Sequence, residues 1–348
     1  MLFPDLCLMV LAGMIAVPPK APPPLESSPA VFHLPEYTHV PPIQLYRARD
    51  GSRLAYRAYP GRDDRVAVLI HGSSGDSTTM HALAKALSSA GITTCALDLR
   101  GHGDSGKLGD IAYMGQLDDD LADFVPVVRS RHPKAKLALV AFSAGGGFGL
   151  RFASGPYGRL FDDYVLLSPY LGADAAVLLR PAARAWSEVD TPRVTGISVL
   201  DRIGIHWFDG LPAVAFAVPP DISQIQASTY SIRLARNFGC EPGCRGDFRS
   251  VHRPMTLLVG GGDELFYANL FPEFIAGVRP DIPVAVLGHY GHMDMIWNPQ
   301  AVREIEGRIA GILRVPEATP SAPDSPVNPA GSGQPSHAAL RSPSSVYR

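Results

Sequence analysis

Ser143 stands where a serine could act as a nucleophile. It follows the apolar segment "KLALVAF" (Lys136–Phe142) and precedes Ala144 and three glycines. A nucleophilic serine needs its Oγ held clear of the backbone, on a sharp strand-to-helix turn with small residues two before and two after it. Ala141 and Gly145 occupy those positions, which gives A-x-S-x-G where G-x-S-x-G is commoner. A serine that only caps a helix gives the same pattern. The pattern alone therefore does not distinguish a nucleophile from a helix cap, and other catalytic residues must be found in the sequence.

Two more side chains could complete a serine hydrolase. Asp263 follows the apolar segment "MTLLVGG", and His292 comes shortly after "PVAVLG". A serine of ordinary pKa needs a base to remove its proton, and that base needs a carboxylate to orient it. The chain order Ser143, Asp263, His292 is the order expected when this turn carries the nucleophile. We expect the N–H groups of Ser73, in "HGSSG", and of Ala144 to form the oxyanion hole.

The elements that would position these residues follow a regular alternation. We expect a hairpin over Gln44–Tyr59, with strands and helices alternating as far as Tyr170 and again from Met255 to Leu313. This alternation predicts an α/β fold with a mostly parallel sheet and helices on both faces. Ligands of such sheets bind beyond the carboxyl ends of the strands, where "HGSSG", "FSAGG", "GGDE" and "GHYGHMD" carry the reactive side chains.

Four segments together resemble the α/β-hydrolase superfamily. They are "LIHGSSGDSTTMHALAKALSSAGITTCALDLRGHGDSG", "VAFSAGG", "LLVGGGDELF" and "GHYGHMDMIWNP". Within the superfamily they look most like the serine-aminopeptidase-like, monoglyceride-lipase and lysophospholipase-type branch. The resemblance covers Leu45–Tyr170 and Met255–Leu313, and Ala141 departs from it. It implies the α/β-hydrolase fold and hydrolysis of a carboxylic ester, with Ser143 as nucleophile.

Neighbouring residues compete for the same roles. His289 lies three residues before His292, but "G-H-M" after a short loop matches the family's histidine segment. Glu264 follows Asp263, and the residue directly after the glycines is the better placed acid. His71 and His102 are expected to fix loops by hydrogen bonds.

No cofactor or metal ion is expected. The H-x2-H-x-D spacing near His292 matches no familiar zinc pattern. The glycines after Ser143 do not form a dinucleotide loop.

The remaining segments divide the chain. We expect an apolar leader or anchor with a Pro-rich tether over residues 1–43, and a core over 44–170 and 254–314. Residues 171–253 break the alternation and predict an inserted, largely helical cap, and 315–348 a disordered Pro- and Ser-rich tail. The cap aromatics Trp186, Trp207, Phe208 and Phe216 would line an apolar pocket or form the core of the cap.

The apolar segment Leu6–Val17 is too short for an easy membrane span, yet it has the length of a signal-peptide core. Export or membrane association is expected if it is a true leader, and a cytoplasmic location otherwise. Cys240 and Cys244, spaced C-x3-C, would pair in an exported protein and stay thiols in a cytoplasmic one.

Composition narrows the class of partner. The formal net charge is −2, with 31 Lys+Arg against 33 Asp+Glu and no basic block, so no nucleic-acid surface is indicated. The sequence therefore predicts a serine hydrolase acting on a short-chain or monoacyl lipid ester. An acyltransferase, a thioesterase and a non-catalytic binding protein of the same fold are the alternatives, and the oligomeric state is left open.

Overall fold

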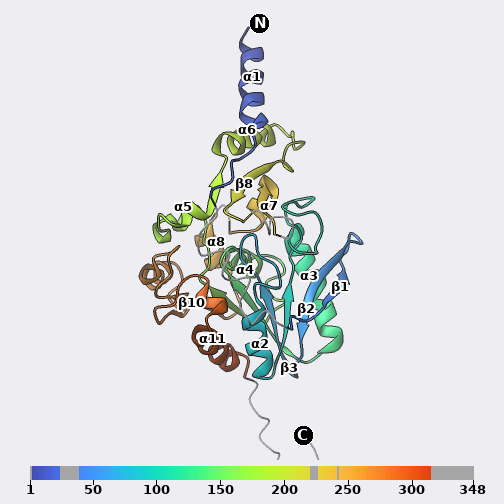
Figure 1. Ribbon diagram of the computed structural model, residues 1–348, viewed down its shortest axis with the longest axis vertical. Helices are drawn as coiled ribbons and strands as arrows, with labels where there is room; N and C mark the ends of the chain where they lie inside the picture. Colours follow the sequence, from blue (N-terminus) through green and yellow to red (C-terminus); the bar gives the residue numbers. More distant parts are fainter. Residues whose placement is uncertain (1, 24–38, 220–225, 241–242, 315–348) are drawn as a thin grey trace, which may run out of the picture. The chain divides into compact units, whose positions relative to one another are not determined.

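The fold is built on an eight-stranded sheet (Figure 1). The structure is a computed structural model that describes residues 2–23, 39–219, 226–240 and 243–314. The strand order is β1-β2-β4-β3-β5-β6-β10-β11. The strands are β1 (Ile43–Arg47), β2 (Arg53–Tyr59), β3 (Arg62–Ile70), β4 (Ile92–Leu97), β5 (Lys136–Phe142), β6 (Asp163–Leu167), β10 (Met255–Gly260) and β11 (Val284–Leu287). Strands β1 and β2 form the predicted hairpin, and β2 pairs with β4 in antiparallel orientation. The neighbouring pairs from β4 to β11 are all parallel.

Helices cover both faces of this sheet, as the alternation predicts. They are α2 (His81–Ser89), α3 (Gln116–Arg131), α4 (Ala144–Ser154), α8 (Cys244–Ser250), α9 (Phe271–Ala276), α10 (Asp294–Trp297) and α11 (Pro299–Ile312). On β3, Val66, Val68 and Ile70 pack with α3 and α4, whereas Ala67 and Leu69 pack with α2 and α11. All five are fully buried. Strands buried on both faces are continuously apolar, which is why β3 and β5 are readable in the sequence.

One predicted helix is shorter than expected. The sequence favours a helix over Leu265–Val278. In the structure, the helical segment begins only at the 3-10 helix η4 (Ala268–Leu270) and continues as α9. The carboxylate of Asp263 accepts hydrogen bonds from the N–H groups of Leu265 and Phe266, at 2.9 and 3.0 Å. These bonds hold the chain in a turn directly after β10, so the helix starts later.

The insertion over residues 171–253 contains more than helices. In the described part of this range, the helical elements besides α8 are η3 (Ala173–Leu178), α5 (Ala183–Trp186), α6 (Thr191–Arg202) and α7 (Ile232–Asn237). A three-stranded antiparallel sheet, not predicted, joins β7 (Ser187–Val189), β8 (Pro212–Phe216) and β9 (Thr229–Ser231). Trp186 and Phe216 line a cavity and Phe208 packs with α6, but Trp207 is 87% exposed, so its assignment to a pocket or core is wrong.

The apolar N-terminal segment forms a helix, α1 (Leu2–Ala16). Its last turn packs on the insertion, where Ile15 lies against Ile197 and Leu200. None of the helices in the described residues is long and apolar enough to cross a membrane. Most of the predicted tether and the predicted tail, residues 315–348, lie outside the described residues.

Cys240 and Cys244 are buried thiols in the structure. A hydrogen bond between the two side chains lowers the pKa of the Cys244 thiol, against the opposing effect of burial. The Cys240 thiol also donates to the carbonyl oxygen of Tyr170, at 3.8 Å.

Candidate active site

Ser143 lies in the turn between β5 and α4, as the sequence predicts. Its backbone has φ +54° and ψ −121°, a conformation that L-residues rarely adopt. Strain of this kind persists only where the surrounding structure holds it. The N–H of Ser143 donates to the carbonyl oxygen of Leu167 at 2.9 Å, and its own carbonyl accepts from the N–H of Tyr170 at 2.9 Å. The turn is thus fixed between β5 and the end of β6.

The glycines after Ser143 allow close approach of neighbouring backbone. A Cβ on Gly145 would lie 2.2 Å from the carbonyl oxygen of His71, and one on Gly147 would lie 2.3 Å from that of Tyr170. Both distances are far below any real carbon–oxygen contact. The glycines therefore let α4 begin against the loop that follows β3 and the loop that follows β6.

His292 joins Ser143 to Asp263. Its Nε2 lies 3.0 Å from the Ser143 Oγ, and its Nδ1 lies 2.9 Å from the Asp263 Oδ2. Both contacts are buried, and His292 is 2% exposed and Asp263 1%. Because the carboxylate accepts a hydrogen bond from the Nδ1–H, the proton of the neutral ring lies on Nδ1, and Nε2 is left to accept a hydrogen bond from the Ser143 O–H. The three sequence-predicted side chains come together in the arrangement that acyl transfer requires.

Asp263 is held as a carboxylate. Burial alone would raise its pKa, but the charge of His292 and hydrogen bonds from His292, Ser168 and the Leu265 N–H outweigh it and lower the pKa below its usual value. Ser168 was not predicted, although its position as a polar residue at the end of β6 is a signal that could have found it. The ionised acid can stabilise an imidazolium on His292.

The residues that compete for the roles of acid and base lie elsewhere or make other contacts. Glu264 accepts a hydrogen bond from the backbone N–H of His292, at 2.8 Å. His289 is exposed, in the turn after β11. His71 and His102 are fully buried, and burial lowers the pKa of each, so both rings are neutral.

The loop from Gly72 to Gly75 lies against the nucleophile. A Cβ on Gly72 would be 3.1 Å from the Cβ of Ser143. The His71 Nε2 accepts from the Leu99 N–H at 3.2 Å, so its Nδ1 carries the proton and donates to the carbonyl of Gly72 at 2.8 Å. In a trans peptide the N–H points opposite to the C=O, so this bond turns the Ser73 N–H away from His71.

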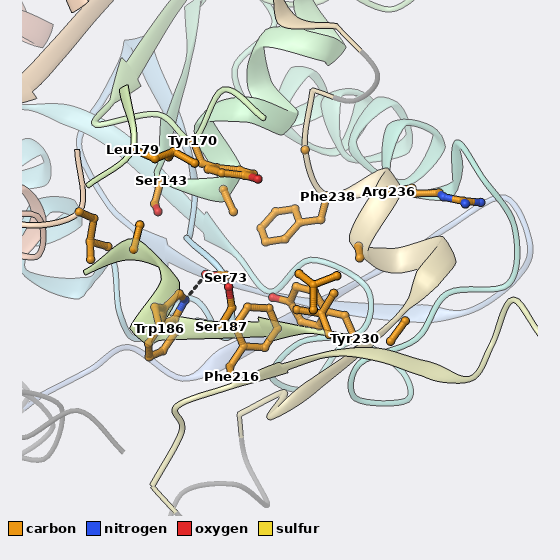
Figure 2. Close-up of a pocket in the computed structure, with 18 of the residues that line it drawn as sticks. Ser73, Ser143, Tyr170, Leu179, Trp186, Ser187, Phe216, Tyr230, Arg236 and Phe238 are labelled. Atoms are coloured by element: carbon orange, nitrogen blue, oxygen red, sulfur yellow. Dashed lines mark hydrogen bonds between the residues drawn. The ribbon is translucent and has the colours of Figure 1, made fainter. Parts of the chain in front are cut away.

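Two cavities meet at Ser143. One, of about 370 Å³, extends under the insertion and is mainly apolar; Figure 2 shows Ser143, Trp186, Phe216 and Phe238 around it. The second cavity, of about 490 Å³, is lined by His292 and by a larger number of polar side chains than the first. Ser73, Ser143, Trp186 and Leu265 line both. Ala144 lines the first, so both predicted oxyanion donors border the space in front of Ser143.

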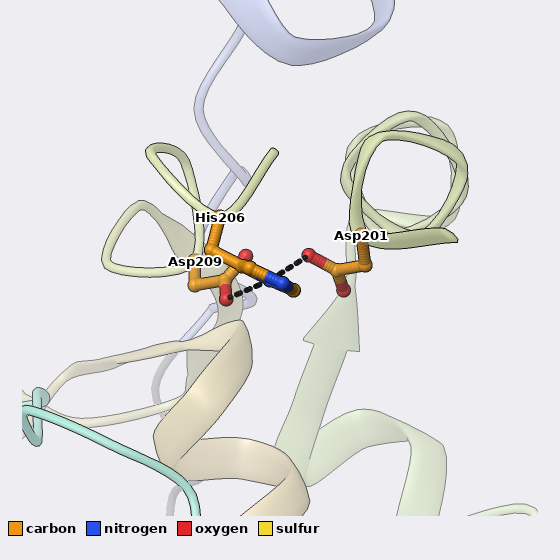
Figure 3. Close-up of side chains that lie close together, drawn as sticks. All are labelled: Asp201, His206 and Asp209. Atoms are coloured by element: carbon orange, nitrogen blue, oxygen red, sulfur yellow. Dashed lines mark hydrogen bonds and ion pairs between the residues drawn. The ribbon is translucent and has the colours of Figure 1, made fainter. Parts of the chain in front are cut away.

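A separate group of acidic and histidine side chains lies in the insertion (Figure 3). The His206 Nδ1 is 3.2 Å from Asp201 and 3.3 Å from Asp209. Arg236 already pairs with Asp201 at 2.8 Å, and His206 is exposed. Hydrogen bonds of His206 and the ion pair between Arg236 and Asp201 therefore account for the cluster.

Comparison with known families gives a match over most of the structure. The family model described as serine aminopeptidase, S33, matches residues 61–293, which include the turn, the acid and the histidine. The chain belongs to this family. Its fold is that of the α/β-hydrolase superfamily, as the resemblance in the sequence implies.

Individual relatives of the S33 chain agree with this. A monoacylglycerol lipase of Mycolicibacterium smegmatis is 33% identical over 143 residues, which cover 37% of this chain and 50% of that protein. The chain thus spans about half the length of the curated relative that it matches. A soluble variant of monoglyceride lipase from Saccharomyces cerevisiae has a TM-score of 0.61 at 17% identity, over 81% of this chain and 99% of that one. A Paleococcus ferrophilus monoacylglycerol lipase has a TM-score of 0.54 at 19% identity, over 74% and 98%. These two structures share the fold.

Proposed function

We propose that the protein hydrolyses carboxylic esters with an apolar acyl part, monoacylglycerols among them, through an acyl-enzyme on Ser143. The observation that carries the proposal is the position of His292, whose two ring nitrogens lie 3.0 Å from the Ser143 Oγ and 2.9 Å from the Asp263 carboxylate. Membership of the S33 family and the likeness to a monoacylglycerol lipase support the choice of reaction and substrate.

The reaction would proceed in two steps. His292 removes the proton of Ser143 as the Oγ attacks the ester carbonyl, and the N–H groups of Ser73 and Ala144 bind the oxyanion. The alcohol leaves with a proton from His292. Water then attacks the acyl-enzyme by the same route and releases the acid, while Asp263 holds the imidazole in its tautomer.

The two cavities suit the two parts of an ester. His292 must protonate the leaving alcohol, and it lines the second cavity together with Glu264 and Asp294. The first cavity contacts Ser143 and Ala144 without His292. The acyl chain is therefore assigned to the apolar cavity under the insertion, and the alcohol to the cavity beside His292.

Labelling with a fluorophosphonate probe tests the proposal. The wild-type protein should label, and both Ser143→Ala and His292→Ala should lose labelling while remaining folded by circular dichroism. A series of p-nitrophenyl esters would then measure preference for chain length, and an added alcohol acceptor would separate hydrolysis from acyl transfer. A folded wild-type protein that neither labels nor hydrolyses any ester would overturn the proposal in favour of a binding protein.

The proposal includes contact with a lipid surface through the apolar segment Leu6–Val17. Met9 and Val10 on α1 are 64% and 54% exposed, and Val17, the residue after this helix, is 67% exposed. Ile15, near the end of the same helix, packs on α6. The full chain should sediment with phosphatidylcholine vesicles, and a variant lacking residues 2–17 should remain in the supernatant. Equal sedimentation of the two would contradict this part.

A further inference from the structure

The loop that carries Ser73 is bonded to the insertion at three points. The indole N–H of Trp186 donates to the Ser73 Oγ at 2.8 Å (Figure 2). The backbone N–H of Ser74 donates to the Tyr230 hydroxyl at 2.6 Å, and the Ser74 Oγ donates to the carbonyl of Ala227 at 2.8 Å. The loop follows β3 in the core, but these three partners all belong to residues 171–253.

The loop needs such support because its backbone is strained. Ser74 has φ +61° and is 1% exposed. A residue with a Cβ adopts this left-handed conformation only at a cost in free energy, and the conformation persists where neighbours fix it. The buried N–H of Ser74 would also lose its partner without the tyrosine hydroxyl. Tyr230 therefore supplies the hydrogen-bond partner of the strained residue in this loop.

The hydroxyl of Tyr230 is itself fixed in direction. Its oxygen lies 2.6 Å from the Nε2 of His102, whose Nδ1 faces the carbonyl of Arg100 at 3.3 Å. A neutral His102 that donates from Nδ1 accepts at Nε2, so the tyrosine O–H donates to His102. The tyrosine oxygen is then free to accept the Ser74 N–H. The centroid of the Tyr230 ring lies 4.5 Å from that of the Phe216 ring, and this edge contact further restricts the side chain.

We propose that Tyr230 and Trp186 are positioning residues that hold the loop Gly72–Gly75 so that the Ser73 N–H faces the oxyanion during acyl transfer. This inference rests on the proposed function. Preorganised donors stabilise developing charge without reorganisation, and a displacement of about 1 Å can cost roughly 10²-fold in rate. The insertion then completes the oxyanion hole in addition to covering the substrate.

Removal of single polar groups tests the proposal. Tyr230→Phe deletes the hydroxyl and keeps the ring, whereas Trp186→Phe deletes the indole N–H together with the five-membered ring that carries it. The matched control is Tyr164→Phe, because that buried hydroxyl donates to the Gly158 carbonyl at 2.9 Å, within the core. With p-nitrophenyl acetate as substrate, we expect kcat of Tyr230→Phe to fall about 10- to 100-fold, less than the ~10²–10³ of losing a donor outright, with KM nearly unchanged. The control should keep the wild-type kcat.

A transition-state analogue separates positioning from general damage. Phenylboronic acid forms a tetrahedral adduct with an activated serine, so its inhibition constant should rise in Tyr230→Phe by the same factor by which kcat/KM falls. Unchanged kcat and boronate affinity, or a loss confined to KM, would overturn the inference. Should thermal unfolding show that Tyr230→Phe does not fold, Trp186→Phe carries the same test. An inactive, unlabelled wild-type protein would instead overturn the proposed function.

Discussion

Glu264 accepts a hydrogen bond from the backbone N–H of His292 at 2.8 Å, while the adjacent Asp263 accepts one from the imidazole Nδ1 of the same residue at 2.9 Å. Two consecutive acids thus hold one histidine by different groups. Only Asp263 touches the ring whose tautomer and charge matter for the proposed reaction, so the two acids should differ sharply in their effect on rate.

Asp263→Asn should lower kcat by about 10³–10⁴, because an amide cannot stabilise the imidazolium and favours the wrong tautomer. Glu264→Gln keeps an acceptor oxygen for the His292 N–H and should lower kcat only severalfold. Steady-state hydrolysis of p-nitrophenyl butyrate by the two folded variants measures the difference. Equal losses would show that Asp263 has no special role.

Ala141, which departs from the usual glycine of the turn, is compensated by Gly149. A Cβ on Gly149 would lie 3.0 Å from the Cβ of Ala141, so the small residue on α4 leaves the room that Ala141 occupies on β5. Gly149→Ala should therefore lower the free energy of unfolding by about 1–3 kcal/mol through overpacking. In the double variant with Ala141→Gly, the contact between the two Cβ atoms is absent, and the higher helix propensity of alanine over glycine stabilises α4.

Urea unfolding of the wild type, the two single variants Gly149→Ala and Ala141→Gly, and the double variant measures the energetic coupling between the two positions. The loss in the double variant should be smaller than the sum of the two single losses. Additive losses would mean that the two positions do not share space.

Some parts of the molecule can be predicted from local sequence patterns and others cannot. The turn at Ser143 and the strand ends carrying Asp263 and His292 follow from local patterns of apolar and small residues. The bond from Ser74 to Tyr230 joins positions 156 residues apart, and no local pattern marks it. Strands β7 and β9 have three residues each, too few for an alternation to be recognised. The sequence therefore predicts the candidate catalytic side chains better than the structure of the insertion.

The buried histidines predict a loss of stability in mild acid. Burial lowers the pKa of His71 and holds the pKa of His102 well below its usual value, while the charges of Asp98 and Asp76 oppose the shift at His71. The unfolded chain takes up protons near a pKa of about 6.5. The stability contributed by the neutral rings is thus complete above about pH 6.5 and is lost as the pH falls towards the folded pKa.

The free energy of unfolding should fall below pH 6.5 by up to ~1.4 kcal/mol per pH unit for each histidine. Urea unfolding between pH 7.5 and 4.5 measures this slope. His102→Gln removes one titrating group and should flatten the slope, whatever its effect on stability at pH 7.5. Parallel profiles for wild type and variant would contradict the prediction.

The length of acyl chain accepted should depend on Val214, which lies on β8 and lines the cavity under the insertion. Each buried CH₂ contributes about 0.8 kcal/mol, or roughly fourfold in kcat/KM, so wild-type activity should rise with chain length until the cavity is filled. Val214→Trp shortens the cavity and should lower kcat/KM for p-nitrophenyl decanoate about 10- to 100-fold while sparing the acetate. Val199→Trp, on the exposed side of α6, is the matched control. An equal loss on both esters would indicate damage to the site as a whole, and full activity on the decanoate would place the acyl chain in the cavity beside His292 instead.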